Sequence, residues 1–269
     1  MTETKGAIFR EMHRPGEPFI LANAWDAGSA RMLEALGARA IATSSAAHAF
    51  TLGRPDGGTL TRDEALAHAQ DLMAAVKVPV QGDFENGFGD DPETCAETVR
   101  LAAEIGLAGI CIEDIQLPGS APYAADLAVE RIRAAADAAP EDFVLCARAD
   151  GVLLGQYDLE EAIARVRAYE AAGAGCVYVP MPGSLEGLRA ICDAVSVPVN
   201  ALAAGPFARV SRAEFAGLGV ARISLGGALA RATHRVIHDA GKAMFDLGDF
   251  SPLAQGLSGE QTDALLRRD

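Results

Sequence analysis

Short apolar runs alternate along this chain with longer segments of helical spacing, and this alternation limits the fold more than any other feature of the sequence. The alternation is typical of parallel β-strands joined by helices. Apolar residues recur at helical spacing in the connecting segments, for example over 61–76, 159–173 and 212–220. Eight runs are predicted as strands: 19–26, 38–45, 78–85, 107–114, 143–150, 176–182, 197–204 and 221–227. Eight strands are what a (β/α)8 TIM barrel requires, so we expect an α/β fold of this kind.

A weak internal repeat supports this count of strands. Four segments each run from a helix through a glycine and a small residue into a strand, with Gly37, Gly106, Gly173 and Gly219 at the junctions. A glycine at such a junction ends the helix in a left-handed conformation. An open doubly wound sheet is the alternative, but the Gly-x-Gly-x-x-Gly loop that would equip such a sheet to bind a dinucleotide is absent.

No linker divides the chain, which favours one domain. We expect the (β/α)8 catalytic barrel over residues 1–240 and a C-terminal helical extension over 241–269. Within this last part of the chain, helices are predicted over 233–245 and 259–269.

Charge and hydropathy exclude several classes of partner. The formal net charge is −14, and Lys and Arg are scattered rather than clustered, so nucleic acid is not an expected partner. No apolar run approaches the roughly 20 residues that a membrane-spanning helix needs. The first residues also lack the basic and apolar regions of a signal peptide. We therefore expect a cytoplasmic protein that does not enter a membrane.

The five cysteines, an odd number, show neither Cys-x-x-Cys nor Cys/His metal-ligand spacing, and several lie inside predicted strands. We predict buried free thiols, with a metal or redox role as the alternative.

The predicted strands end on polar residues, and a parallel barrel carries its chemistry at these ends. The residues concerned are Asp26, Thr43, Ser44, Ser45, Asp83, Glu85, Glu113, Asp114, Arg148, Asp150, Tyr178, Asn200 and Ser224. Strand periodicity places Asp83 and Glu85 on one face, and Glu113 follows on the next strand. Three converging carboxylates repel one another unless a cation relieves them, and oxygen ligands suit Mg2+ or Mn2+. We predict that these three acids hold a metal, and that Asp114 and Asp150 cap the following helices.

Several motifs, in this order, resemble the isocitrate lyase and phosphoenolpyruvate mutase superfamily over roughly residues 23–231. They are NAWDAGSARMLEALGARAIATSS, LGRPDGGTLTRDE, GDFENGFGDDPE, GICIEDIQLPG, CARADG and VPVNALAAG. The resemblance implies a (β/α)8 barrel whose last helix is exchanged between subunits, so that a homodimer or homotetramer is expected. It also implies Mg2+ dependence and chemistry on small 2-oxo or 2-hydroxy acids through an enolate-like species.

The same resemblance implies roles for individual residues. Asp83 would bind the metal directly or through water, Glu85 and Glu113 would hold metal-bound waters, and Asp56 would lie over the reacting centre as a catalytic residue. These roles agree with elementary chemistry, since a cation and oriented donors stabilise an enolate more than its precursor.

Five further positions are expected to meet the substrate. Ser44 and Ser45 would offer backbone N–H groups and a hydroxyl to a carboxylate or to the developing enolate oxygen, and Ser45 would thereby be catalytic. Arg148 would pair with a carboxylate through two parallel hydrogen bonds, in a binding and a catalytic role. Trp25 would form a pocket wall, and Asn200 would contact the substrate.

Each role has a plainer alternative. Asp56 lies in a Pro-Asp-Gly-Gly sequence that is typical of a turn. Ser44 and Ser45 could cap a helix, Arg148 could pair with Asp150, and Trp25 could be plain packing. None of the histidines falls at a predicted strand end, and only His48, just after the second strand, remains a candidate base.

The loop after the fourth predicted strand departs from the family. Isocitrate and methylisocitrate lyases carry a Lys-[Lys/Arg]-Cys-Gly-His sequence there, whereas residues 115–126 hold no Cys, His or Lys. This loop also lacks the Lys and the Asn or Thr of the phosphonate-processing relatives. Its glycine and prolines suit a mobile lid, and Ser120 and Tyr123 are its candidate proton donors.

These residues predict a Mg2+-dependent carbon–carbon lyase or decarboxylase that acts on a small 2-oxo or 2-hydroxy carboxylate. A phosphonopyruvate- or carboxyphosphonate-type mutase or hydrolase is one alternative. A catalytically silent, metal-dependent binder of 2-oxo acids is the other.

Overall fold

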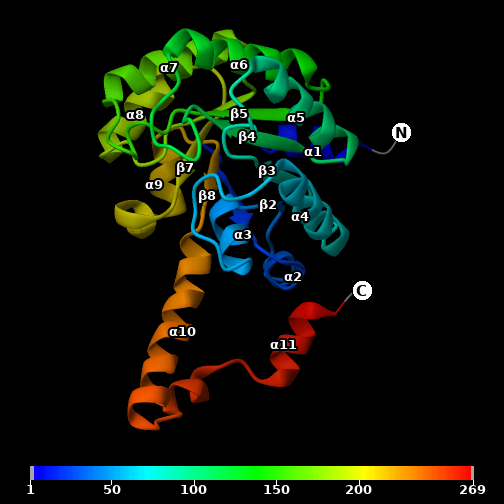
Figure 1. Ribbon diagram of the computed structural model, residues 1–269, viewed down its shortest axis with the longest axis vertical. Coiled ribbons are helices and arrows are strands. Elements are labelled where there is room, and N and C mark those ends of the chain that lie inside the picture. The colour runs from blue at the N-terminus through cyan, green and yellow to red at the C-terminus, as the bar shows by residue number, and fades with distance from the viewer. Residues whose placement is uncertain (1–2, 268–269) are drawn as a thin grey trace.

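The computed structural model describes residues 3–267 and confirms the (β/α)8 barrel (Figure 1). Eight parallel strands close in chain order, and β8 pairs with β1. The strands are β1 (Phe19–Asn23), β2 (Ala40–Ala42), β3 (Val80–Asp83), β4 (Gly109–Glu113), β5 (Val144–Arg148), β6 (Cys176–Tyr178), β7 (Val199–Leu202) and β8 (Arg222–Ser224).

The strands are shorter than the apolar runs predicted. β2 covers three residues of the run over 38–45, and β3 ends at Asp83 rather than Glu85. The residues that follow stay buried without being strand, as Phe84, which is fully buried, illustrates. The apolar pattern therefore reports burial, and burial at the top of the barrel continues into the loops.

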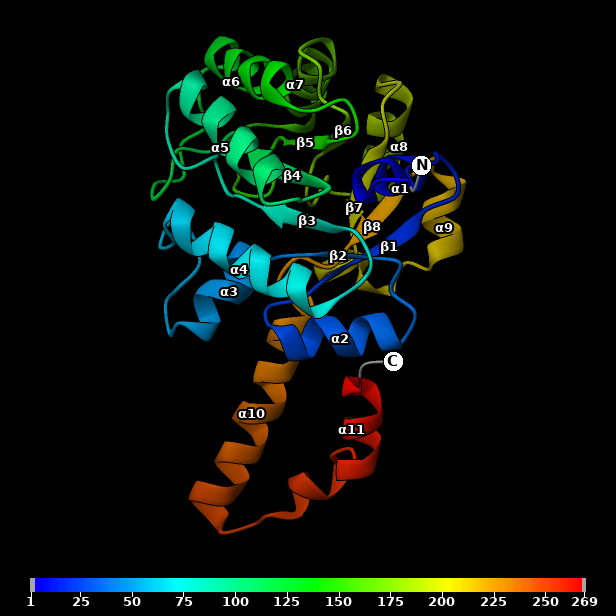
Figure 2. The ribbon, with the colours of Figure 1, turned by 90° about the vertical axis from the view of Figure 1, so that its right-hand side faces the viewer.

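Helices follow the strands around the outside of the barrel (Figure 2). They are α2 (Ala27–Ala35), α3 (Ser45–Thr51), α4 (Arg62–Ala75), α5 (Pro92–Glu104), α6 (Ala125–Ala138), α7 (Leu159–Ala171), α8 (Leu185–Ala194), η1 (Gly205–Arg209) and α9 (Arg212–Gly217). Gly37, Gly106, Gly173 and Gly219 follow helix ends with φ between 89° and 102°, which confirms their predicted left-handed role.

The amino end of the barrel is closed by α1 (Lys5–Glu11). Phe9 of this helix belongs to the apolar cluster inside the barrel, and the guanidinium of Arg10 donates to the carbonyl of Phe143, just before β5 begins. The carboxyl end, where the predicted site residues gather, is therefore the end left for chemistry.

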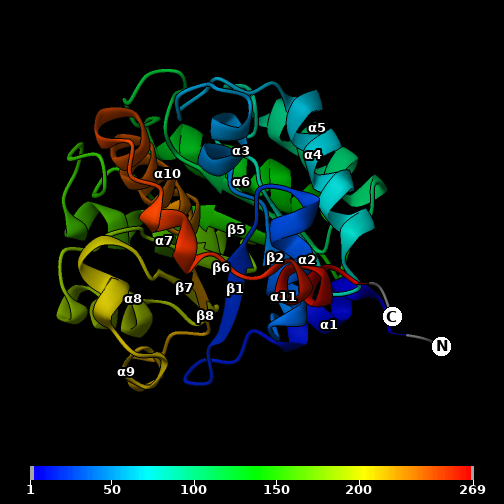
Figure 3. The same ribbon diagram turned by 90° about the horizontal axis from the view of Figure 1, so that it is seen from below.

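The chain ends in an arm that leaves the barrel. Helix α10 (Ala228–Leu247) points away from the barrel, and η2 (Ser251–Gln255) and α11 (Gly259–Leu266) turn back toward α2 (Figures 1 and 3). The Arg31 guanidinium in α2 donates to the carbonyl of Leu266 at 3.5 Å. Residue 240, the expected domain boundary, lies within α10, and residues 268–269 of the predicted last helix lie outside the described residues.

All five cysteines are free, and Cys192 is the one that is not fully buried, so the prediction of buried free thiols is confirmed for the other four. Within the described part of the chain, none of the helices combines the length and the apolar character that a membrane crossing requires.

Candidate active site

A cavity of about 390 Å3 opens at the carboxyl end of the barrel. Its lining includes residues from all eight strands or the loops that follow them. Of the predicted site residues, it contains Ser44, Ser45, Asp56, Asp83, Glu85, Glu113, Arg148, Asp150, Tyr178, Asn200 and Ser224. The polar strand ends therefore do meet in one place.

Asp83 is held at the last position of β3 by three donors. Its Oδ2 accepts the backbone N–H and the hydroxyl of Ser45, each at 2.9 Å, and its Oδ1 accepts Nη1 of Arg148 at 3.1 Å. Its own N–H donates to the Thr43 hydroxyl at 2.7 Å. The carboxylate is thus oriented before any ligand enters the cavity, and the Ser45 hydroxyl, expected to face the substrate, is directed at Asp83 instead.

Arg148, at the end of β5, links the acids. Its Nε and Nη2 donate to the two oxygens of Asp150 at 3.0 and 2.5 Å, which confirms the alternative that these residues pair. Its Nη1 lies 3.1 Å from Asp83 and 3.3 Å from Oε2 of Glu113. One guanidinium therefore compensates three carboxylates, and its orientation is fixed by the bidentate pair with Asp150.

The Glu85 side chain lines the cavity, but a turn rather than the strand alternation that we predicted directs it there. It follows β3 in a turn with φ of 46°, an uncommon conformation for a residue with a side chain. Its Oε1 accepts the N–H of Gly58 at 3.0 Å. Burial raises the pKa of the Glu85 carboxyl to about 7, and the nearby charges of Asp83 and Asp56 add to the shift.

Glu113 ends β4 beside this pair. Burial raises the pKa of its carboxyl well above the usual range, the Arg148 charge opposes the shift, and Asp150, Asp83 and Glu85 reinforce it. Arg148 alone therefore does not offset burial and the mutual repulsion of these acids, so Glu85 and Glu113 resist ionisation.

Asp114 and Asp150 do not cap helices, so that prediction was wrong. The first turn of α6 has no side-chain cap, and α7 is capped by Asp158. Asp150 pairs with Arg148 instead. Asp114 lies behind it, where its Oδ1 accepts the Asp150 N–H at 2.9 Å and its Oδ2 accepts the Arg165 guanidinium at 3.1 Å. Both aspartates are buried, and they hold the loop after β5 in place.

The remaining predicted residues divide between the cavity and other places. Asp56 lies exposed on the loop that borders the cavity mouth. Ser44 caps α3 by accepting the N–H of Ala47, as its alternative predicted. Asn200 lines the cavity, but its amide donates to the Ser224 hydroxyl and accepts from Arg222, so both of its ends are already bound.

Trp25 is not brought to the central cavity. It borders a separate hollow of about 480 Å3 between α2, α3 and α4, together with His48 and His68. The two imidazole rings stack there at 3.8 Å between centroids, and Nε2 of His68 lies 2.9 Å from the Trp25 carbonyl. His48 is thus not positioned as a base for the acid cluster.

The loop over 115–124 covers part of the cavity. It folds back on itself, since Gln116 donates its N–H to the carbonyl of Ala121 and Ile115 bridges to Pro122. Ser120 lines the cavity, whereas the Tyr123 hydroxyl is buried and donates to Asp90 at 2.6 Å. Of the two candidate proton donors, Ser120 alone faces the site.

The cavity lining also contains residues that the sequence analysis did not single out. They are Leu153 and Leu154 after β5, Pro180 after β6, Leu202 at the end of β7, and Arg231 of α10. Among residues 3–267, no carboxylate forms an ion pair with Arg231. Arg231 lies in the first turn of α10, beyond the strand ends from which site residues were predicted.

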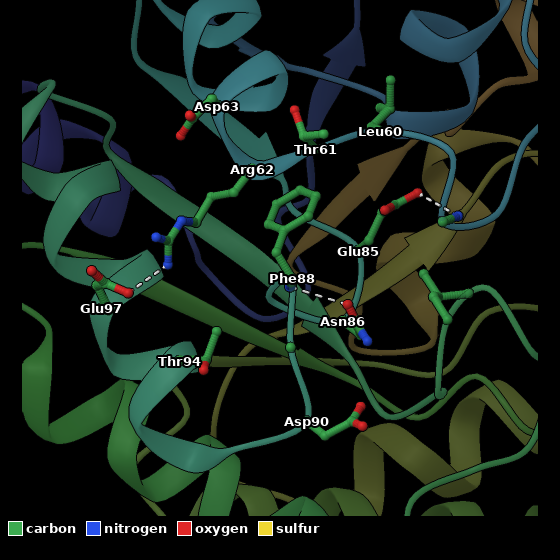
Figure 4. Close-up of a pocket in the computed structure, with 13 residues that line it drawn as sticks. Leu60, Thr61, Arg62, Asp63, Glu85, Asn86, Phe88, Asp90, Thr94 and Glu97 are labelled. Atoms are coloured by element: carbon green, nitrogen blue, oxygen red, sulfur yellow. Dashed lines mark hydrogen bonds and ion pairs between the residues drawn. The ribbon is translucent and has the colours of Figure 1, made fainter.

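A second hollow, of about 630 Å3, adjoins the cavity and shares Glu85 and Leu117 with it (Figure 4). In the close-up, Glu85 bonds to Gly58 at one edge, and Phe88 lies between Glu85 and the Arg62–Glu97 ion pair. Glu85 therefore forms part of the partition between the two spaces.

The carboxylates of the cavity are candidate ligands for a divalent cation. Within residues 3–267, no three His, Cys, Asp or Glu side chains are arranged to hold a metal ion by themselves, since Arg148 lies between Asp83 and Glu113. Mg2+, however, commonly binds one or two carboxylates and keeps several waters. Hard oxygen donors on one wall of an open cavity, whose ionised forms a bound cation would stabilise, fit that mode.

The fold recurs in a known family of proteins. Residues 9–245 match the family model described as phosphoenolpyruvate phosphomutase. The chain belongs to this family, within the isocitrate lyase and phosphoenolpyruvate mutase superfamily.

Its relatives catalyse more than one reaction. The chain is 33% identical to 2-methylisocitrate lyase of Escherichia coli K12, over 73% of this chain and 69% of that protein. It is 32% identical to oxaloacetate decarboxylase of Paraburkholderia xenovorans LB400, over 82% and 75%. A Burkholderia cenocepacia J2315 structure, provisionally assigned as a lyase or mutase, has a TM-score of 0.90 and 44% identity over 96% and 95% of the chains.

Proposed function

We propose that the chain is a Mg2+-dependent carbon–carbon lyase or decarboxylase for small 2-oxo or 2-hydroxy carboxylates, with decarboxylation of a 2-oxo diacid as its main reaction. The observation that carries this proposal is the wall of Asp83, Glu85 and Glu113 around Arg148, beneath a lid whose cavity-facing polar side chain is a serine. Oxaloacetate decarboxylase and 2-methylisocitrate lyase among the relatives are consistent with it.

The metal would be held by few protein ligands. Asp83 would be the direct or water-mediated ligand, and Glu85 and Glu113 would hold water molecules around the ion. When bound, Mg2+ would supply positive charge at the 2-oxo group of the substrate.

The protein's own groups would orient the substrate. Arg148, fixed by Asp150, would attract a substrate carboxylate in addition to its present partners. Ser45 holds Asp83 in position, so its contribution would be indirect. Asp56 at the mouth and the lid would limit the entry of water.

The lid favours decarboxylation over aldol-type cleavage. Cleavage of a 2-hydroxy acid requires a base for the hydroxyl proton and an acid for the departing carbanion. Loss of CO2 from a 2-oxo diacid such as oxaloacetate, whose second carboxylate lies β to the 2-oxo group, needs neither at that step, because the electron pair of the broken bond moves toward that carbonyl and forms an enolate. Ser120, a weak acid, is the one polar side chain that the lid offers to the cavity.

The test follows oxaloacetate, 2-methylisocitrate, dimethylmalate, 2-oxoglutarate and phosphonopyruvate by proton NMR. Each acid is incubated with protein and Mg2+, with protein and EDTA, and with Mg2+ alone. We expect oxaloacetate or a related 2-oxo diacid to disappear faster than in the Mg2+ control. EDTA should abolish the difference, and Asp83→Ala should lower the rate by about 10²-fold or more.

Asp71→Asn is the matched control, because Asp71 is an exposed carboxylate that lines the Trp25 hollow rather than the cavity. Its rate should equal that of the wild type. Release of phosphate from phosphonopyruvate would favour the phosphonate alternative. Mg2+-dependent binding without any turnover would identify a silent binder, and either result would contradict the proposal.

A further inference from the structure

A row of three cysteines crosses the inside of the barrel below the acid cluster. Cys111 of β4 is the register partner of Cys146 of β5, and Cys146 is the register partner of Cys176 of β6. All three belong to the apolar cluster inside the barrel. The sequence predicted buried free thiols, and the closed sheet places three of them on neighbouring strands at the same height.

The spacing of these residues suits covalent linkage. Register partners on neighbouring parallel strands lie about 4.8 Å apart, within the Cα separation of roughly 4.4–6.8 Å that disulfides span. The Cys146 position lies between those of Cys111 and Cys176 in the register of the three strands. Cys146 therefore has two possible partners, and Cys111 and Cys176 have one each.

One member of the row meets the cavity. Cys111 contributes to the cavity lining, whereas Cys146 and Cys176 are fully buried behind it. A small oxidant that enters the cavity therefore reaches Cys111 first.

A buried positive charge lies beside the row. Arg222, 1% exposed, donates to Gln81 at 2.5 Å, to Asn200 at 2.9 Å and to Nε2 of His13 at 3.2 Å. Burial and the Arg222 charge lower the pKa of His13 to about 3, so this imidazole is a neutral acceptor. In the part of the chain that the structure describes, no carboxylate pairs with Arg222.

An unpaired guanidinium favours negative charge on neighbouring sulfur. Burial raises the pKa of the Cys111 and Cys176 thiols, whereas contacts with these two thiols and the Arg222 charge lower the pKa of the Cys146 thiol. Cys146 is therefore the thiol of the row that ionises most readily, which suits it to attack an oxidised neighbour.

We propose that this row is a redox modification site, in which hydrogen peroxide entering the cavity oxidises Cys111 and Cys146 then closes a disulfide with it. In the first step, the Cys111 sulfur takes one oxygen of the peroxide, the O–O bond breaks, and one water leaves, which gives a sulfenic acid. In the second step, the Cys146 sulfur attacks that sulfur, the S–O bond breaks, and a second water leaves. Two thiols lose two electrons, and the peroxide gains them.

The link would act on the candidate active site directly. Cys111 and Cys146 lie two residues before Glu113 and Arg148, which are themselves register partners. A bond between the two sulfurs would pull these strands together beneath the pair that holds the acid cluster. The proposal does not depend on the proposed function, since its readout is a covalent bond.

The test maps disulfides after peroxide treatment of the folded wild-type protein, by alkylation in denaturant and mass spectrometry of unreduced tryptic peptides. The five cysteines fall in five different tryptic peptides, over 78–100, 101–131, 134–148, 168–189 and 190–209. We expect a link between 101–131 and 134–148, with loss of two hydrogen atoms, reversed by a thiol reductant.

Two variants separate the roles within the row. Cys146→Ser should leave a Cys111 sulfenic acid that dimedone traps, without a disulfide. Cys192→Ser, which removes the more accessible thiol of α8, should form the same link as the wild type. The proposal is overturned if Cys111 and Cys146 stay reduced in the folded wild type while Cys192 is oxidised. It is also overturned if the Cys111–Cys146 link forms only in protein that has been unfolded. This wild-type result needs no variant to fold.

Discussion

Arg148 is the residue on which the acid cluster depends most. Lysine would keep the charge but could not donate to Asp150 through two atoms while also reaching Asp83 and Glu113. We expect Arg148→Lys to lower kcat/KM for the accepted acid by roughly 10²–10³-fold. Steady-state kinetics measures this loss, and Arg62→Lys, in an ion pair outside the cavity, serves as control. Activity within twofold of the wild type would contradict the role given to the guanidinium.

Glu85 should make the stability of the metal-free protein depend on pH. Its pKa is about 7 in the folded protein and about 4.5 in the unfolded chain, so between these values the folded state binds more protons. The free energy of unfolding contributed by Glu85 is therefore present below about pH 4.5 and is lost as pH rises through about 7. After discounting for solvent screening, the loss is about 1–2 kcal/mol.

Urea denaturation of wild type and Glu85→Gln at pH 5 and pH 8, with EDTA, measures this contribution. The free energy of unfolding of the variant, relative to that of wild type, should increase from pH 5 to pH 8, because the amide does not titrate. A stability difference that is the same at both pH values would show that Glu85 is already ionised at pH 5.

At the scale of elements, the loop over 52–60 and the lid meet at Gly58. This glycine has φ of 73°, and a Cβ there would lie 2.9 Å from Cα of Pro118 and 3.0 Å from Cβ of Leu117. Its N–H also donates to Glu85. Gly58→Ala should therefore displace the lid and the Glu85 contact, lowering kcat/KM by about tenfold or more.

Gly53→Ala is the matched control for this prediction. Gly53 lies in the same loop with φ of 68°, but a Cβ there would meet nothing within 4 Å. Both variants should lose about 1–2 kcal/mol of stability from the left-handed backbone, as urea denaturation reports. Equal effects of the two variants on activity would refute a specific contact between loop and lid.

The sequence predicted the elements better than it predicted the geometry between them. Strand count, glycine junctions and the meeting of Asp83, Glu113 and Arg148 follow from periodicity and from the rule that chemistry lies at carboxyl strand ends. Glu85 was placed on the correct wall for the wrong reason, because a left-handed turn after β3 directs it there. Trp25 borders a different hollow from the acids, since the pattern fixes where a strand ends but not which side of the barrel the next residue faces.

Contacts between side chains of different strands were the hardest property to predict from the sequence. Asp114 and Asp150 were expected as caps from local preference, but contacts across strands hold them. The thiol row was invisible for the same reason, since the register of β4, β5 and β6 decides which cysteines become neighbours.

At the scale of the whole molecule, the arm carries an apolar surface that its own barrel does not cover. Val236, Ile237, Phe245 and Leu247 of α10 are between 68% and 87% exposed. An apolar surface of this kind marks an interface. We propose that the arm packs on a second copy of the chain, giving a homodimer or a larger homo-oligomer.

Light scattering coupled to size exclusion tests this proposal. The wild type should elute as an oligomer, and Val236→Glu with Ile237→Glu should shift it toward the monomer, because charge at a packed interface costs several kcal/mol. Lys242→Gln, an exposed polar position of the same helix, is the control. A monomeric wild type at micromolar concentration would contradict the proposal that the arm packs on a second copy.

Different parts of the chain form the charged wall of the cavity and its apolar lining. The acids and Arg148 come from β3, the turn after it, β4 and β5, whereas Leu153, Leu154, Leu202 and Arg231 come from the loop after β5, from β7 and from α10. Mutations in the later segments can therefore accumulate without disturbing the charged wall. Lineages that share this barrel could acquire new substrates by remodelling one half of the cavity while inheriting the other half unchanged.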